Sequence, residues 1–204
     1  MHDLRRGSGG CRLRSMTTTT DYVDNILDVY SRATDAEYAH GLIWYNRANA
    51  IAWGLDHLNY KRAAGVIAAL SPLLSWNKNV EYAGLVYAGE TRIPCLQKNA
   101  AKAILIRNGW NPLDYLSGPK VVSFYHNIVN PYSDDPRHVT IDKHAFDICI
   151  GDMDNPYKNG KAVTAALYPI MRTAYVIAAN EAGVRPLQMQ AITWEAWRNM
   201  KNGK

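Results

Sequence analysis

The sequence predicts an all-α protein. Apolar residues recur at helical spacing through most of the 204 residues, and Asp, Asn, Gly and Pro stand where helices would begin and end. Val139-Thr140-Ile141 is the clearest β-prone run, and it is too short to form a sheet. The hydrophobic share of 48% and the charged share of 20% are typical of a folded globular domain.

Caps and apolar spacing predict the helices in the first half of the chain. Thr20-Asp21 can cap the first of them, because Thr and Asp side chains accept hydrogen bonds from free amides at a helix N-terminus. The Ala-rich segment that begins at Tyr60 is expected to be buried, with a break at Ser71-Pro72 near its end. The expected helices run over residues 21–30, 35–58, 60–74, 76–87 and 99–107.

Shorter helices and Gly- or Pro-containing turns are predicted in the second half. Asn108-Gly109 ends the preceding helix, because Gly tolerates the left-handed conformation found at helix C-termini. The segment Leu116 to Val122 is predicted to be a tight hairpin with a lysine where it opens the next helix. Asn130 to His138 contains two prolines and is expected to be a loop. The expected helices run over residues 112–116, 121–128, 145–150, 161–182 and 187–200.

The positive charge is concentrated at the N-terminus. The chain carries a net charge of +5, of which residues 1–16 supply +3 from four arginines and one aspartate. Only +2 remains for the rest of the chain, so a nucleic-acid footprint would need a local basic patch. We expect residues 1–20 to be a disordered extension, and Met16 is a candidate for the natural start.

Cysteine usage and hydropathy predict a cytoplasmic protein without a metal site. Cys11, Cys95 and Cys149 are scattered, which favours free thiols and excludes the spacing of zinc and iron–sulfur sites. No apolar run has the length of a membrane span, and no secretory signal is evident.

Two short segments suggest a function. The first contains Leu116, Gly118, Lys120 and Val121, and the second is Ile141-Asp142-Lys143-His144. They resemble the L-P-G-x-G-x-K hairpin and the V-D-x-H segment of the helix-hairpin-helix DNA glycosylases (the HhH-GPD superfamily). Ala69-Leu70-Ser71 and the run from Lys98 to Ile106 are similar to two further helices of that family, in the same order.

The resemblance covers roughly residues 63 to 180 and identifies a divergent member. The hairpin is two residues shorter than the family pattern and has one glycine. Leu73 stands near the place where the family carries a glutamine, and the cysteine cluster of some members is missing. These departures look like those of a phage-type branch.

The resemblance implies an architecture and a reaction. It implies a two-lobed helical bundle with a cleft between the lobes, in one domain over residues 21–204 with the hairpin near 112–128. It further implies a monomer that binds double-stranded DNA, flips out a nucleotide and removes a damaged or modified base, with a lysine-dependent AP-lyase step. No iron–sulfur cluster is implied, and a monovalent cation bound to the hairpin is allowed.

Lys120 and Asp142 are the implied catalytic residues. Lys120 would attack the sugar C1′ and expel the base, and a lysine must first lose its proton to do so. Asp142 would stabilise the positively charged sugar or deprotonate the attacking group. Two structural roles remain open: Lys120 as a phosphate-binding cation and Asp142 as a helix N-cap.

Further residues are predicted to contact DNA or the flipped base. Gly118 is expected to let the backbone approach a phosphate, because a side chain there would hold the backbone away. Aromatic faces and polar edges suit a base pocket, although the same aromatics could simply pack between helices. The DNA-binding candidates are Gly118, Pro119, Val121, Lys143 and His144, and the base-pocket candidates are Tyr45, Trp76, Asn77 and Tyr125, with Gln188, Gln190, Trp194 and Trp197 as C-terminal alternatives.

Two other functions fit the same residues. A phage-type enzyme on this fold would modify a 5-substituted thymine that stays attached to its sugar. A non-catalytic DNA-binding module would keep the scaffold without turnover. Reaction products separate the three hypotheses: a free base, a changed base still in the strand, or no change.

Overall fold

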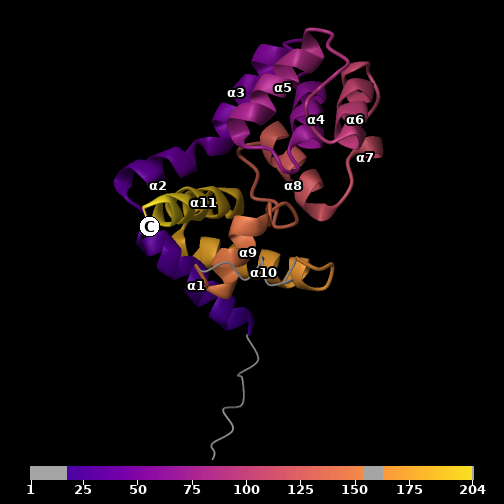
Figure 1. Ribbon diagram of the computed structural model, residues 1–204. Helices are drawn as coiled ribbons and strands as arrows, with labels where there is room; N and C mark the ends of the chain where they lie inside the picture. The colour runs from indigo at the N-terminus through magenta and orange to yellow at the C-terminus, as the bar shows by residue number, and fades with distance from the viewer. Residues whose placement is uncertain (1–17, 154–162, 204) are drawn as a thin grey trace, which may run out of the picture.

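A computed structural model describes residues 18–153 and 163–203 of the chain, and the helices of these ranges gather around two hydrophobic cores (Figure 1). The described residues contain no strand, so the predicted all-α class is confirmed. The helices are α1 (Thr19–Ser31), α2 (Asp35–Leu42), α3 (Trp44–Leu55), α4 (Tyr60–Leu70), α5 (Trp76–Tyr87), α6 (Gln97–Arg107), α7 (Pro112–Tyr115), α8 (Pro119–Val129), α9 (Lys143–Ile150), α10 (Leu167–Ala182) and α11 (Pro186–Asn202).

Helices α3 to α8 enclose the first core, which we call the upper core after its place in Figure 1. Its centre is α4, in which every residue from Ala63 to Leu70 is buried. Small side chains let α4 pack closely against α3, α6 and α8. A Cβ atom on Gly65 would lie 2.7 Å from Cβ of Pro112, so glycine sets how near the start of α7 can come. The expected burial of this Ala-rich helix is confirmed.

Helices α1, α9, α10 and α11 enclose the second, or lower, core. Phe146, Met171 and Tyr175 are among its fully buried side chains. Asp147 of α9 is also fully buried, and Lys201 near the end of α11 forms a 2.8 Å salt bridge with it. A buried carboxylate needs such a partner, because isolated charge is costly to remove from water.

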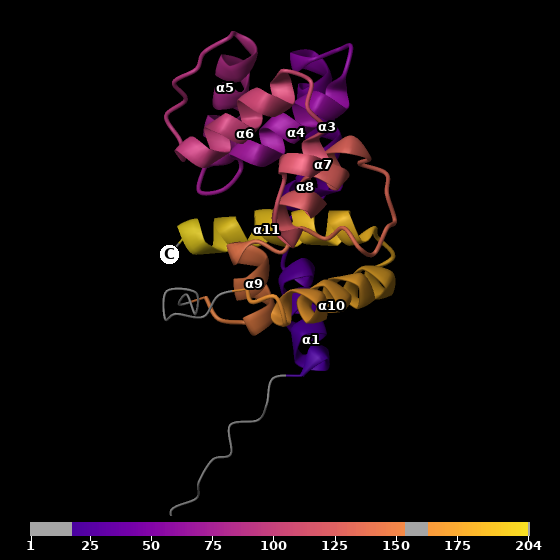
Figure 2. The same ribbon diagram turned by 90° about the vertical axis from the view of Figure 1, so that its right-hand side faces the viewer.

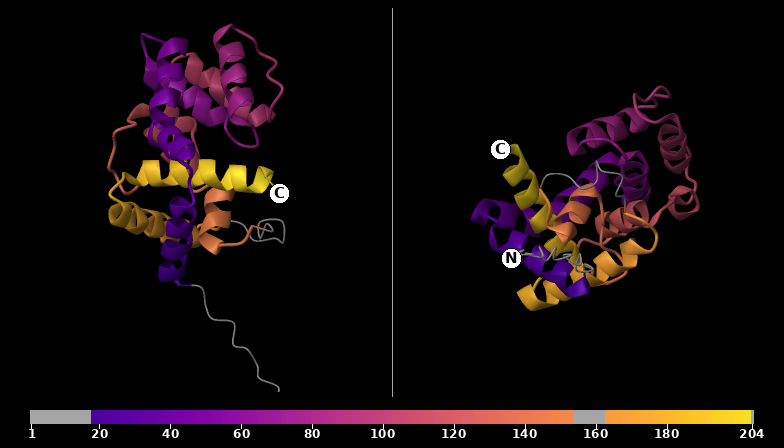
Figure 3. Two further views of the ribbon diagram at one scale, coloured as in Figure 1. Left: turned by 90° about the vertical axis from the view of Figure 1, so that its left-hand side faces the viewer. Right: turned by 60° about the horizontal axis from the view of Figure 1, so that its bottom comes forward.

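Helix α11 lies between the two cores (Figures 2 and 3). Leu187 and Ala191 belong to the upper core, whereas Met189, Ala196 and Trp197 belong to the lower one. Two buried stripes on one helix therefore join the two halves of the molecule.

One predicted helix is wrong: residues 35–58 do not form a single helix. The chain breaks at Ile43, whose φ of −110° and ψ of 9° are not helical. The two pieces pack on different partners, because α2 lies against α11 while α3 lies against α4 and α8. Regular apolar spacing continues across the break, so the pattern alone could not reveal it.

Two predicted boundaries also need correction. Residues 18–20 were expected to be disordered, but Thr18 is the N-cap of α1 and forms a capping box with Asp21. The helix expected from residue 161 begins at Leu167, and residues 163–166 are not helical. The rest of the predicted extension, residues 1–17, lies outside the described residues, as do residues 154–162.

Cys95 and Cys149 are both free thiols. Within the described ranges, no helix combines the length and the hydropathy that a membrane span requires.

We expect Gly41→Ala to destabilise the fold by about 1–3 kcal/mol, because a Cβ atom there would lie 2.5 Å from Cα of Ile192 and force α2 away from α11. Gly84→Ala in α5 is the matched control, since its Cβ would meet nothing within 4 Å. That substitution should stabilise the protein by about 0.5–1 kcal/mol through helix propensity alone. Urea unfolding of both variants tests the packing, and equal stabilisation by the two substitutions would contradict it.

Candidate functional site

A cavity opens where the upper and lower cores meet. It encloses about 580 Å³, including its open mouth. Both halves of the molecule contribute to its walls, so it exists only because α11 holds them together. The lining residues are Trp44, Tyr45, Ser71, Leu74, Trp76, Asn79, Lys120 and Phe124 from the upper half, and Thr140, Asp142, Gln190, Ala191 and Trp194 from the lower half and α11.

The turn between α7 and α8 places Lys120 in this cavity. Gly118 ends the turn with a φ of 83°, a left-handed conformation that favours glycine. Pro119 follows as the first residue of α8, where its fixed φ suits a helix start and its missing N–H is not needed. Lys120 is half-buried, and its ammonium has no hydrogen bond or salt bridge to any described residue.

Asp142 is held in place by two hydrogen bonds. Its Oδ1 accepts from the backbone N–H of Ala145 at 2.9 Å, which makes Asp142 the N-cap of α9. Its Oδ2 accepts from Nε1 of Trp194 on α11 at 3.1 Å. The capping role considered for this residue is therefore present, and the second oxygen is turned toward a residue that lines the cavity.

Tyr168 fixes the extended segment that leads to Asp142. Its buried hydroxyl donates to the carbonyl of Val139 at 2.7 Å and accepts from the N–H of Ile141 at 3.2 Å. One side chain thus satisfies two buried backbone groups of a segment that has no strand partner. The position of Asp142 depends on this local clamp as well as on its own hydrogen bonds.

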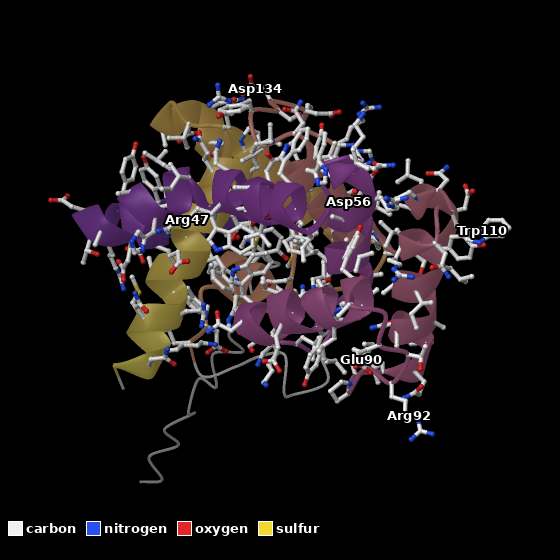
Figure 4. All side chains as sticks on the ribbon, turned by 90° about the horizontal axis from the view of Figure 1, so that it is seen from above. Arg47, Asp56, Glu90, Arg92, Trp110 and Asp134 are labelled. Carbon is white, nitrogen blue, oxygen red and sulfur yellow. The ribbon has the colours of Figure 1, made fainter. Side chains whose placement is uncertain are left out.

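Aromatic rings form much of the cavity wall. The ring of Trp44 lies 4.9 Å from those of Tyr45 and Trp76, 6.0 Å from Phe124 and 6.1 Å from Trp194. These are ordinary separations for interacting aromatic pairs. Trp110, by contrast, is 56% exposed and projects away from the helices (Figure 4).

A buried hydrogen-bond network joins the two halves behind these rings. The hydroxyl of Tyr45 donates to Oε1 of Gln190 at 2.8 Å and lies 3.1 Å from Oγ1 of Thr140. Nδ2 of Asn127 also donates to that Thr140 oxygen, at 3.3 Å. Burial raises the pKa of Tyr45, so its hydroxyl keeps its proton and remains a donor.

Oδ1 of Asn127 in this network has no hydrogen-bond partner, and the side chain of Asn79, which lines the cavity, is unpaired as well. Asn79 is only 2% exposed, yet its Oδ1 has no hydrogen-bond partner and no described residue bonds to its Nδ2. Gln190, which is 5% exposed, likewise makes no hydrogen bond through Nε2. Both side chains line the cavity with polar groups that the protein itself leaves unpaired.

The structure brings together only part of the predicted base pocket. Tyr45 and Trp76 line the cavity, as do Gln190 and Trp194 among the alternatives. Four candidates lie outside it. Asn77 is exposed to solvent, Tyr125 and Trp197 are buried in the upper and lower cores, and Gln188 donates to the carbonyl of Leu42.

The predicted DNA-binding residues are spread around the hairpin and the start of α9. Gly118 and Pro119 are exposed, whereas the Val121 side chain packs against the upper core and leaves only its backbone for a ligand. Lys143 and His144 are half-buried on α9. Nδ1 of His144 is buried without a hydrogen bond, and its ring lies 6.1 Å from Trp194.

Sequence reasoning missed several lining residues, and a helical pattern could have supplied one of them, Asn79. Asn79 lies on the buried face of α5 with Tyr82, Ala83 and Val86, so an amide stands in an otherwise apolar stripe. Asn77 is two residues away and therefore faces nearly the opposite direction. Trp44 and Thr140 carried no comparable signal, because contacts distant in sequence bring them to the cavity.

No metal site accompanies the cavity. Among the residues described, no group of three or more His, Cys, Asp and Glu side chains could hold a metal ion. The hairpin-bound monovalent cation stays a prediction.

The fold and the site define an all-helical protein with a lysine, a carboxylate and an aromatic wall in one cavity between two cores. The chain belongs to a family of unknown function (DUF7178), whose model matches residues 11–201. No curated protein and no solved structure matches the chain.

Two stacked histidines brace the loop that precedes Asp142. The rings of His126 on α8 and His138 in the loop are 3.9 Å apart and nearly parallel. Burial lowers the pKa of both, and the positive charge of Arg137 adds to this, while Asp135 acts in the opposite direction. His126 and Arg172 lower the pKa of His138 further, because positive charge near a histidine disfavours its protonated form.

We expect the free energy of unfolding to fall as the pH drops below the ordinary histidine pKa of 6.5. A lowered pKa in the folded state means that the unfolded chain binds more protons in this range, so stability is complete above it and is lost on acidification. His144, whose pKa burial also lowers, contributes in the same window. Urea unfolding between pH 7.5 and 5 measures the effect. His138→Gln should flatten the profile, whereas the exposed His57→Gln should not, and identical profiles for both would refute the assignment.

Proposed function

We propose that this protein is a DNA-binding, base-flipping enzyme of the helix-hairpin-helix DNA glycosylase type. One observation carries the proposal. Lys120 and Asp142, the two residues that the motif resemblance marks as catalytic, line the same cavity although they belong to different halves of the molecule. The two cores with a cavity between them are what a two-lobed glycosylase would need.

The cavity suits a flat heterocycle. A nucleobase must leave the duplex before an enzyme can act on it, and aromatic side chains then stack on its faces. Trp44, Trp76 and Trp194 supply such faces here. Asn79 and Gln190 supply polar groups for the edge of the base.

Asp142 has the position of an electrostatic stabiliser. Breaking the bond between C1′ and the base nitrogen sends the electron pair to the base and leaves positive charge on the sugar. A fixed carboxylate beside the sugar would favour that charge, or would take the proton of an attacking water. The hydrogen bonds from Ala145 and Trp194 hold Asp142 rigid for this role.

Lys120 would be the nucleophile in a lyase step. Its neutral amine would attack C1′, the electron pair of the glycosidic bond would leave with the base, and the base would take up a proton. Opening of the sugar ring would then give a Schiff base. Lys120 and Asp142 form no salt bridge with each other, so neither side chain is prevented from acting by an ion pair with the other.

The start of α8 suits a DNA phosphate. No side chain caps this helix, and its first amides follow the exposed Gly118 and Pro119. Free amides at a helix N-terminus bind anions, and a phosphate contact there would position Lys120 near its sugar.

Leu73 suits a wedge that fills the space left by the flipped nucleotide. It is 87% exposed and, among the described residues, is the one non-glycine with a positive φ, 67°. Its neighbours Ser71 and Leu74 line the cavity, and Leu73 itself lines an adjacent hollow with Pro72. Apolar side chains that are inserted between base pairs keep a DNA step unstacked.

The first test is mass spectrometry of bases and nucleosides after incubation with duplexes that carry damaged, deaminated or 5-substituted bases. A released base is expected. Asp142→Asn should slow the release by about 10²–10⁴-fold, because Asn keeps the helix cap but removes the charge. Lys120→Ala should abolish borohydride trapping of the enzyme on DNA.

Arg92→Ala is the charge control, because Arg92 is exposed, projects outward (Figure 4) and does not line the cavity, and the substitution should leave both activities unchanged. Unchanged base release in Asp142→Asn would refute the mechanism. A mass shift on a base still attached to its sugar would indicate the phage-type modification reaction. DNA binding without any product, strengthened by Asp142→Ala, would indicate a non-catalytic module.

Leu73→Ala should lower base release by about tenfold or more, because unstacking a nucleotide costs a few kcal/mol and the wedge offsets part of it. Stability should not fall, since the side chain is largely exposed. Leu58, which is 83% exposed, provides the matched control, and Leu58→Ala should retain full activity. A 2-aminopurine probe beside the target reports unstacking, and equal signals for both variants would contradict the wedge.

A further inference from the structure

The cavity contains three polar groups without a hydrogen-bond partner in the protein. Whether each group is a donor or an acceptor determines which ligand could pair with all three. Oδ1 of Asn79 is a buried acceptor without a partner, whereas Nδ2 of Asn79 and Nε2 of Gln190 are donors that make no hydrogen bond to a described residue. The oxygen of the Gln190 amide accepts from the Tyr45 hydroxyl, which leaves the amide nitrogen for the cavity. The protein thus offers two donors and one acceptor.

Oδ1 of Asn79 is buried, and buried polar groups are normally paired. Leaving them unpaired lowers stability, so an unsatisfied amide in a folded protein needs a reason. Asn79 is the clearest case, because it is 2% exposed and makes no side-chain hydrogen bond within the described chain. A ligand that brings complementary groups would remove the deficit when it binds.

Resting on the function proposed above, we propose that Asn79 and Gln190 select a pyrimidine as the flipped base. The pairing edge of thymine or uracil carries two carbonyl acceptors around one N–H donor, and that of cytosine carries two acceptors and one amino donor. Either pattern satisfies all three protein groups. Guanine offers one acceptor and two donors, and adenine one of each, so both purines leave one of the two protein donors unpaired. Such mismatches are what make hydrogen-bonding sites selective.

The test measures binding to four duplexes that differ only in the target nucleotide, which is placed opposite an abasic site so that flipping costs little. The targets are thymine, cytosine, guanine and 3-methylthymine, whose ring N–H is blocked. Wild-type protein should bind the thymine and cytosine duplexes at least about tenfold more tightly than the other two.

Asn79→Leu should reduce this preference to about twofold or less, because leucine has a similar size and no polar group to leave unpaired. Asn77→Leu is the matched control on the same helix, and it should keep the wild-type preference because Asn77 lies outside the cavity. Gln190→Glu is a second, independent variant. It keeps an oxygen for Tyr45 but replaces a donor by an acceptor, so both pyrimidines should bind more weakly.

A stability measurement separates selection from a structural role. Without DNA, Asn79→Leu should melt at the same temperature as wild type or higher, because it removes an unsatisfied polar group. A clear fall in melting temperature would show that Asn79 is needed for the fold, and would overturn the inference.

The possible failures are distinct. If none of the four duplexes binds, the function proposed for the cavity is refuted, and the proposed base preference is refuted with it. Equal binding of all four, or an undiminished preference in Asn79→Leu, overturns the pyrimidine inference and leaves the DNA-binding function standing.

Discussion

The molecule depends on the burial of α11 between two cores. Leu187 and Ala191 on one side of the helix and Met189, Ala196 and Trp197 on the other remove apolar surface from water in two directions. The two halves have few other direct links, among them the Tyr45 hydroxyl bonds to Thr140 and Gln190. Loosening α11 would therefore open the cavity as well as destabilise the fold.

The same helix organises the site chemically. Trp194 faces the cavity and donates its indole N–H to Asp142, so the carboxylate on α9 is oriented by a residue of α11. Arg198, one turn further on, lies 4.3 Å above the centroid of the Trp194 ring, and this cation–π contact helps to hold the ring in place. Asp142 is thus fixed by its own helix cap and by a ring that packing already holds, which is the rigidity that an electrostatic role requires.

Local chemistry made much of the fold predictable. The all-α class, the buried α4 and the turn that presents Lys120 follow from spacing, small residues and a Gly-Pro pair. The break at Ile43 and the cavity wall were not predictable in this way. The break and the cavity wall depend on which core each helix joins. The contacts that decide this connect residues far apart in the sequence, such as Tyr45 and Gln190. Asn77 was predicted to line the pocket, but α5 turns Asn79 toward the core and leaves Asn77 exposed.

The separation of Lys120 from Asp142 follows from the same architecture. Lys120 is carried by α8, which packs in the upper core, and Asp142 by the start of α9, which packs in the lower core. Opposite charges that share a cavity would pair if their helices could approach, and pairing would neutralise both. Each backbone is held by its own core, so the charges stay apart unless the cores themselves move. A ligand that entered between them would meet a lysine on one side and an aspartate on the other, and α11 holds the two cores that carry these residues.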